Sequence, residues 1–297
     1  MKKALVVLNK NSGQFKGHRM EAQLIRKLKE MHYETMLRPT PETGAEGIIT
    51  QHAADKDLIV IVGGDGTISE VIDALMRQEL KIPVAIIPTG TVNDLARVHN
   101  IPLNPEKAIG QFGRWAESPI DIIKLNDRHA GYLVALGAFM TAFAAVDAGV
   151  KNKLGRLAYL FAGTRMLLRL ERYNVTMKTE EREVEEASVL TIISKLRSVG
   201  SLGRLIGKAG PDDGLLHIIN IRPVNVLEAL HLVWLAVSGN ITDHRKVEYM
   251  TAESAEIKAA GLKLMNIDGD LHDYEDLDIS VMCGAVSLLK PVSSKNS

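Results

Sequence analysis

Short runs of consecutive apolar residues alternate, through the first 125 residues, with segments in which apolar residues recur every three or four positions. The runs predict buried strands, because a strand covered on both faces is apolar at every position. The three-to-four spacing predicts amphipathic helices. We predict strands at residues 4–8, 33–37, 58–62 and 84–87. The predicted helices are residues 48–54 and 68–76 and one whose apolar face carries Met20, Leu24, Ile25, Leu28 and Met31. The pattern predicts a mostly parallel sheet with helices on both faces.

After residue 125 the pattern changes to segments rich in β-branched or alternating apolar residues, separated by turn signals such as Asp212-Asp213-Gly214 and Asp268-Gly269. Such a pattern is typical of antiparallel sheets. The predicted strands are residues 175–177, 184–194, 215–221, 255–265 and 279–289, with helices near 155–170 and 225–237. A chain of 297 residues is long enough for two domains. We therefore predict an α/β domain over residues 1–125 and a β-rich domain over 126–290, with residues 285–297 able to return to the first.

The composition, 46% hydrophobic and 24% charged, is typical of a globular protein. The 36 basic and 36 acidic side chains cancel, which argues against a nucleic-acid partner. A single cysteine excludes an internal disulfide and a multi-cysteine metal site. The apolar run behind Lys2 and Lys3 is too short for a signal peptide, and no stretch reaches the ~20 strongly apolar residues of a membrane span. We expect a cytoplasmic protein without a transmembrane segment, able to attach peripherally to the inner face of the membrane.

The most informative segment is a glycine-rich loop between a predicted strand and a predicted helix, Gly63-Gly64-Asp65-Gly66-Thr67-Ile68-Ser69. Glycine lets the backbone approach phosphates closely, and a helix N-terminus offers N–H groups and the positive end of its dipole to an anion. Asp65 would be repelled by a polyphosphate unless a cation neutralised the charge. The loop therefore predicts nucleotide phosphates with Mg²⁺ facing Asp65. The alternative is a tight turn in which Asp65 only caps the helix. The loop matches neither the P-loop nor the G-x-G-x-x-G motif.

Three other turns follow predicted strands of the same sheet. Pro88-Thr89-Gly90-Thr91-Val92-Asn93-Asp94 comes after the fourth strand, and there Thr91 or Asn93 could cap a helix and donate to a ligand. Asn9 and Ser12 lie in the turn Asn9-Lys10-Asn11-Ser12-Gly13 after the first strand, and Thr40 lies just past the second. Because turns at the carboxyl ends of parallel strands line one crevice, these segments predict a single nucleotide site.

These motifs resemble those of the diacylglycerol kinase catalytic-domain family of lipid kinases, which includes the sphingosine kinases, and are most similar to its bacterial members of about this length. The resemblance spans nearly the whole chain in the family's order. It is carried by Asn9–Gly13, Gly63–Thr67, Pro88–Asp94, Asp212–Leu215 and Asp268–Asp270. It implies an α/β nucleotide-binding domain, a mainly antiparallel β-sandwich domain for the lipid, and ATP in the cleft between them.

The resemblance also implies roles for individual residues. The nucleotide would be held by Asn9, Ser12, Thr40, Gly63, Gly64, Asp65, Gly66, Thr67, Ser69, Thr91 and Asn93. Asp268 would be the general base for the lipid hydroxyl, with Asp270 and Asp65 as the other catalytic carboxylates. A structural Mg²⁺ would bind Asp213 and backbone oxygens near Gly210 and Leu215. Two residues on the nucleotide side depart from the family: Lys10 stands where it often has Pro, and Ser69 where it often has Asn.

Other functions stay open at this point. NAD kinases share the Gly-Gly-Asp-Gly-Thr loop, but their second loop typically reads Asn-Glu where this chain has Asn93-Asp94. Phosphofructokinases carry a related loop, yet the second half of this chain does not alternate strands and helices. A catalytically silent nucleotide or lipid sensor would have no need for Asp65 and Asp268. Asp268-Gly269 is also a strong hairpin signal, so it could be a turn and nothing more.

The substrate side is less defined by the sequence. Six basic residues and one acidic residue lie among apolar ones between Lys151 and Arg172. A basic amphipathic helix suits an anionic membrane surface; the alternative is a helix packed on the sheet with a solvated charged face. We expect a lipid substrate taken at a membrane surface, with diacylglycerol as the default and phosphatidylglycerol, a monoacyl lipid, a sphingoid base or a polyprenol open. The oligomeric state, a homo-oligomer included, is also open.

Overall fold

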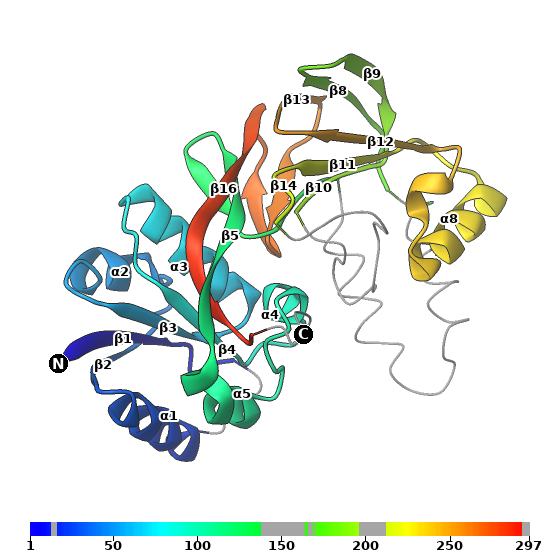
Figure 1. The fold of residues 1–297 in the computed structure, drawn as a ribbon. Coiled ribbons are helices and arrows are strands. Elements are labelled where there is room, and N and C mark those ends of the chain that lie inside the picture. Colours follow the sequence, from blue (N-terminus) through cyan, green and yellow to red (C-terminus); the bar gives the residue numbers. More distant parts are fainter. Residues whose placement is uncertain (13–16, 138–163, 166–167, 169, 196–211, 293–297) are drawn as a thin grey trace. The chain divides into compact units, whose positions relative to one another are not determined.

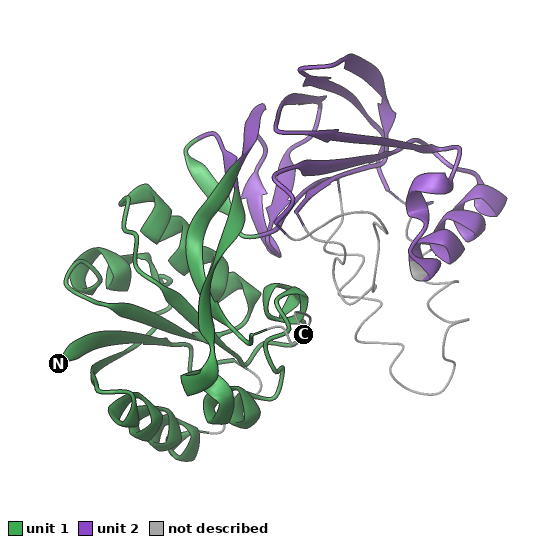
Figure 2. Ribbon diagram, viewed as in Figure 1, with its two compact units in different colours: residues 1–122, 127–131, 282–297 green, residues 123–126, 132–281 purple. Residues whose placement is uncertain are grey.

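The computed structural model describes residues 1–12, 17–137, 164–165, 168, 170–195 and 212–292, and it divides into two compact units (Figure 2). Unit 1 consists of Met1–Ile122, Asp127–Gly131 and Met282–Ser297. Unit 2 consists of Ile123–Asn126 and Tyr132–Val281. The first unit thus takes in the C-terminal part of the chain as well as the N-terminal part.

Unit 1 is built on a parallel sheet in the order β2-β1-β3-β4-β16 (Figure 1). The strands are β1 (Lys2–Leu8), β2 (Tyr33–Pro39), β3 (Leu58–Gly63), β4 (Val84–Pro88) and β16 (Leu277–Lys290). β16 lies parallel to β4 through the pairs Leu288–Val84 and Leu289–Ala85. The prediction of a mostly parallel sheet is confirmed.

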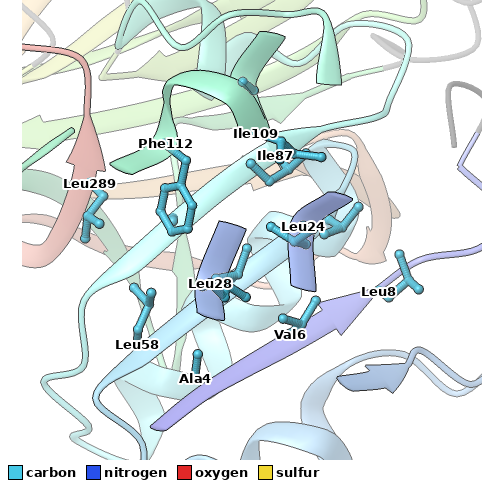
Figure 3. Packing of buried hydrophobic residues seen from close by; sticks show 14 of the residues in the cluster. Ala4, Val6, Leu8, Leu24, Leu28, Leu58, Ile87, Ile109, Phe112 and Leu289 are labelled. Carbon is cyan, nitrogen blue, oxygen red and sulfur yellow. The ribbon is translucent and has the colours of Figure 1, made fainter. Parts of the chain in front are cut away.

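Helices cover both faces of this sheet. They are α1 (His18–Glu30), α2 (Glu46–His52), α3 (Asp65–Arg77), α4 (Asp94–Val98) and α5 (Pro105–Gln111), followed by the 3₁₀ turn η1 (Phe112–Arg114). On one face, β1 residues Ala4, Val6 and Leu8 form a core with α1 and with fully buried Phe112 (Figure 3). On the other, α3 packs on β3 and α2 packs against α3. Alternate residues of each strand point to opposite faces, so continuous apolar runs are needed to bury both.

The predicted apolar face of α1 differs from the observed one at a single residue. Met20, Leu24 and Leu28 are buried, and Met31 packs against the same core. Ile25 is 39% exposed. Its position is one residue past Leu24, which turns it 100° around the helix and away from the buried stripe.

Unit 2 contains antiparallel sheets, as predicted. One has the order β12-β11-β10-β7-β14-β15. Its strands are β7 (Leu133–Leu136), β10 (Leu190–Ser194), β11 (Leu216–Ile221), β12 (Val247–Ala252), β14 (Leu264–Ile267) and β15 (Asp270–Asp273). The other pairs β8 (Tyr173–Thr179) with β9 (Glu183–Ser188) and with β13 (Ser254–Ala260), and β13 with residues 277–280 of β16. Elsewhere, β5 (Ala116–Leu125) pairs with β6 (Arg128–Ala130) and with β16.

Two apolar runs that predict single strands are each divided between the two sheets of unit 2. The run 184–194 contains β9 and β10, separated at Val189. The run 255–265 contains β13 and the start of β14, separated at Gly261, whose φ is +81°. At Val189 the residues on both sides of the break are buried, so hydrophobicity gives no sign that the chain changes sheets. At Gly261 the flanking residues are exposed or partly exposed, and the glycine and Lys263 mark the break.

The predicted helix near residues 225–237 is α8 (Val226–Ser238), which begins with a capping box between Asn225 and Glu228 and is followed by the short η2 (Ile241–Asp243). Gly239, in the left-handed region, ends it. Most of the predicted helix near 155–170 and most of the basic segment 151–172 lie outside the described residues. No helix in the part of the chain that the structure describes is long and apolar enough to cross a membrane.

Candidate active site

The predicted nucleotide-binding turns of unit 1 all begin where strands of the parallel sheet end. Backbone hydrogen bonds tie the first residue after a strand to the end of a neighbouring strand. They run from the N–H of Asn9 to Val62 (2.8 Å), from Thr40 to Leu8 (2.9 Å) and from Thr89 to Gly63 (2.9 Å). The structure therefore brings the turns after β1, β2, β3 and β4 to one edge of the sheet.

The turn after β1 is joined to the glycine-rich loop by side chains. Asn9 Nδ2 donates to the hydroxyl of Thr67 at 2.9 Å. Asn9 Oδ1 accepts the backbone N–H of Asn11 at 3.0 Å, which folds the turn back on itself. Thr67 lies in the first turn of α3 and is buried. Two residues predicted to hold the nucleotide are thus in direct contact.

A second link joins the glycine-rich loop to the turn after β4. The carboxylate Oδ2 of Asp65 accepts the backbone N–H of Asn93 at 2.7 Å. Asn93 has a φ of +54°, a left-handed conformation that Asn tolerates better than most residues. Its side chain donates from Nδ2 to the carbonyl of Gly90 (2.8 Å), and its Oδ1 accepts the Gly90 N–H (3.0 Å). Asn93 is the N-cap residue of α4, but its side chain holds Gly90 rather than the helix.

Glycine is required where these two loops meet. A Cβ on Gly90 would lie 2.6 Å from Gly64 Cα and 2.8 Å from Asn93 Oδ1. A Cβ on Gly63 would lie 2.6 Å from the Cβ of Thr67. Real Cβ atoms do not come so close to other heavy atoms, and at Gly90 the obstacle is backbone, which yields least. The two loops are therefore in backbone-to-backbone contact.

We expect Gly90→Ala to separate the two loops and to weaken ATP binding. Overpacking of this kind costs about 1–3 kcal/mol of unfolding free energy. Thermal unfolding and the KM for ATP measure the two effects. Gly110→Ala is the matched control, because it lies in α5 and no atom lies within 4 Å of a Cβ built there. Equal stability and equal KM in the two variants would contradict the close contact.

Two features of this edge are compatible with binding of an anion such as a phosphate. α3 begins at Asp65, so the N–H groups of its first turn and the positive end of its dipole lie in the glycine-rich loop. Thr89 is fully buried beside it, and within the described residues its hydroxyl oxygen makes no hydrogen bond. Ser12, Gly66 and Ser69 are partly exposed and Thr91 is exposed, so a ligand could reach them.

Glu70 and Thr89 belong to this edge but were not among the predicted site residues. Glu70 Oε2 accepts the backbone N–H of Ala45 at 2.7 Å and so holds the segment that follows Thr40. Its signal in the sequence was weak, because an acidic residue on the first turns of a helix is common. Thr89 lies inside the motif Pro88–Asp94, but only its complete burial in the structure distinguishes it from the other residues of that motif.

Asp268 lies in unit 2, in the turn of a hairpin. β14 and β15 pair through Ile267 and Asp270, which leaves Asp268 and Gly269 as a two-residue turn. Their φ angles are +51° and +111°, as the primed hairpin turns require. The hairpin signal is confirmed, and it is compatible with a chemical role for the side chain.

The surroundings of Asp268 fix its carboxylate. The side chain is buried, and its Oδ1 accepts the backbone N–H groups of Tyr132 (3.0 Å) and Leu133 (2.9 Å). The Asp268 N–H donates in turn to the Leu133 carbonyl at 2.9 Å. Hydrogen bonds from N–H groups to a carboxylate are stronger than those between neutral groups. Asp270, by contrast, is exposed on β15.

The predicted structural Mg²⁺ site at Asp213 contains a lysine. Lys195 Nζ lies 2.7 Å from the Leu215 carbonyl oxygen and 3.3 Å from Asp213 Oδ1. The other carboxylate oxygen, Oδ2, lies 2.9 Å from His217 Nε2. Burial lowers the pKa of His217, against the opposite effect of Asp213. Gly210 lies outside the described residues. Among the described residues, no group of three or more His, Cys, Asp and Glu side chains is arranged to hold a metal ion.

Solved structures share this fold. A crystal structure described as a diacylglycerol kinase from Bacillus anthracis strain Sterne superimposes with a TM-score of 0.79 over 97% of both chains, at 22% identity. Named relatives are similar over most of their length. A diacylglycerol kinase of Staphylococcus carnosus is 27% identical over 91% of this chain and 89% of its own, and one of Bacillus subtilis is 28% identical over 91% and 90%.

Family comparison assigns both halves of the chain. Residues 3–125 match the diacylglycerol kinase catalytic domain, and residues 133–290, more than half of the chain, match the YegS C-terminal NAD kinase beta sandwich-like domain. The chain therefore belongs to the diacylglycerol kinase-type family that joins these two domains. It is an enzyme of the phosphotransferase class with an alcohol group as acceptor, and its family membership supports lipid kinase activity.

Proposed function

We propose that the chain transfers the γ-phosphate of ATP to the hydroxyl group of a membrane lipid, with diacylglycerol as the first substrate to test. The relatives in Staphylococcus carnosus and Bacillus subtilis carry the name diacylglycerol kinase. The observation that carries the proposal is the Asp65–Asn93 link, which joins two glycine turns at the strand ends of unit 1, in a chain of this kinase family.

Unit 1 supplies the nucleotide site in this proposal. Phosphoryl transfer depends on positioning and charge neutralisation more than on covalent chemistry. The backbone of Gly63–Thr67 and the first turn of α3 would cradle the phosphates, and the side chains at the neighbouring turns would orient them. Mg²⁺ bound with ATP supplies positive charge at the phosphates, and Asp65 is the unit 1 carboxylate that we assign to face it.

Unit 2 supplies the base. We assign Asp268 to accept the proton of the lipid hydroxyl while the hydroxyl oxygen forms a bond to the γ-phosphorus. The bond between that phosphorus and the β–γ bridging oxygen breaks, and ADP leaves with its electron pair. The two backbone N–H groups on Oδ1 keep the carboxylate in one orientation, which a general base requires. Asp270 is assigned to the same site as a supporting charge.

The test is an assay with ATP labelled in its γ-phosphate and a panel of acceptors, run with and without Mg²⁺. The panel contains diacylglycerol, phosphatidylglycerol, a monoacyl lipid, a sphingoid base, a polyprenol and NAD. We expect label in a lipid product that disappears when Mg²⁺ is removed. Label in NADP would instead establish an NAD kinase, the class named in the description of the domain matched by residues 133–290. No labelled product with any acceptor would favour a sensor.

A further inference from the structure

Lys195 has the position in which the resemblance places a divalent cation. The residue directly follows β10, and its backbone N–H donates to the Tyr132 carbonyl at 2.9 Å. Its side chain runs into the interior of unit 2 and is 0% exposed, one of the largest fully buried side chains among the described residues. A buried ammonium is unfavourable unless anionic or carbonyl oxygens surround it. Two oxygens that surround it here are Asp213 Oδ1 and the Leu215 carbonyl oxygen.

These oxygens are also the ones that a divalent cation would need. Mg²⁺ and Ca²⁺ bind carboxylate and backbone carbonyl oxygens at about 2.0–2.6 Å. An ion bound to both Asp213 Oδ1 and the Leu215 carbonyl would use the two oxygens that Lys195 Nζ already contacts at 3.3 and 2.7 Å. The buried ammonium would then compete for these oxygens and face a double positive charge close by. The ammonium therefore opposes binding of the ion.

The carboxylate of Asp213 also has contacts in the same turn and on the strand β11 that follows it. Oδ1 also accepts the backbone N–H of Leu215 at 3.2 Å, and Oδ2 contacts His217 Nε2. The other ring nitrogen of His217 contacts the Tyr249 hydroxyl at 2.7 Å, which fixes the orientation of the ring. One negative carboxylate is therefore matched by one positive ammonium, and the turn is held to the end of β10.

We propose that the Lys195 ammonium replaces the structural cation in this chain, so that the pair of buried Lys195 with partly exposed Asp213 holds this turn of unit 2, which does not depend on a divalent ion. The predicted structural Mg²⁺ at Gly210, Asp213 and Leu215 is then absent from the native protein. This statement concerns unit 2 alone and is separate from any Mg²⁺ that accompanies ATP.

Thermal unfolding of the full chain without ATP or lipid tests the proposal apart from the kinase reaction. We expect the same Tm in excess Mg²⁺, in excess Ca²⁺ and in EDTA. Lys195→Met leaves the partly exposed Asp213 carboxylate and the Leu215 carbonyl without the ammonium, so its Tm in EDTA is expected to fall by about 5 °C. Added Mg²⁺ or Ca²⁺ should restore part of this loss, because binding to the folded state alone stabilises it. Lys178→Met is the control, since Lys178 and its partner Glu256 are each 52% exposed.

Two results would overturn the proposal. One is a wild-type Tm that falls in EDTA and loses this dependence in Asp213→Asn. The other is a Lys195→Met variant as stable as Lys178→Met. If Lys195→Met does not fold, the double variant Lys195→Met with Asp213→Leu provides the answer, because Asp213→Leu alone leaves the buried ammonium without its carboxylate, and removing both charges should recover that loss. The proposal is supported if the Tm of the double variant does not depend on divalent ions and is higher than that of Asp213→Leu. It is contradicted if the Tm of the double variant is lower than that of Asp213→Leu.

Discussion

Asp268→Asn is expected to lower kcat by about 10²–10⁴-fold, the contribution of a general base, while ATP binding stays unchanged. Asparagine keeps an oxygen that can accept the N–H groups of Tyr132 and Leu133, and it tolerates the positive φ of the turn. The hairpin should therefore persist, and only the ability to accept a proton is lost. Steady-state kinetics with the labelled lipid, together with ATP titration by calorimetry, separate the two quantities.

Asp273→Asn is the matched control for this prediction. It makes the same substitution at an exposed residue of β15, five positions further along the same hairpin. We expect wild-type turnover in that variant. Turnover in Asp268→Asn equal to that of Asp273→Asn would remove Asp268 from the role of base and would leave the hairpin as a structural feature.

Asp65→Asn is expected to reduce kcat by about 10²–10³-fold and to raise the Mg²⁺ concentration needed for half-maximal rate. Asparagine retains an oxygen for the N–H of Asn93, so the link between the loops at 2.7 Å survives. The substitution removes the negative charge of the side chain, and therefore also its attraction for a cation beside the phosphates. The substitution therefore separates two roles of Asp65, joining the loops and facing the metal.

The comparison variants for Asp65 are chosen to test each role. Asp65→Ala removes the link as well as the charge, so it should also lower the Tm. Asp55→Asn changes a carboxyl group whose side chain is 57% exposed and should leave both rate and Mg²⁺ dependence unchanged. If Asp65→Asn kept full activity while Asp65→Ala lost it, the residue would serve only to hold Asn93.

The sequence predicted the sheet of unit 1 well because its central strands β1, β3 and β4 are buried on both faces from Ala4 to Leu8 and along β3 and β4. Leu58–Val62 and Val84–Ile87 are almost completely inaccessible, and nothing but a covered parallel strand explains so many consecutive apolar residues between helical patterns. The turns at the strand ends followed from the same topology. The pairing of β16 with β4 could not be read from sequence periodicity, since it joins residues about 200 positions apart.

Unit 2 was less predictable for physical reasons. The chain passes between sheets at Val189 without a break in hydrophobicity, so this run looks like one strand. Near Gly261 the break is a short exposed turn between two strands, and apolar residues on either side of it resemble one run. Lys195 gave no signal either, because a single lysine after a strand is normally solvated. Only its burial and its distances to Asp213 and Leu215 reveal that it is part of the interior. The sequence identifies the motif Asp212–Leu215, but it does not show that the ammonium of Lys195 lies against Asp213 and Leu215.

The backbone contact between Gly64 and Gly90 has a consequence for exchanging segments between related kinases. In a chimera that takes only one of the two loops from a relative, the backbone of that loop would have to pack against a loop with which it did not evolve. The loops should therefore be transplanted together, along with Asp65 and Asn93 that join them. Insertions or deletions in one loop would likewise have to be matched by a compensating change in its neighbour.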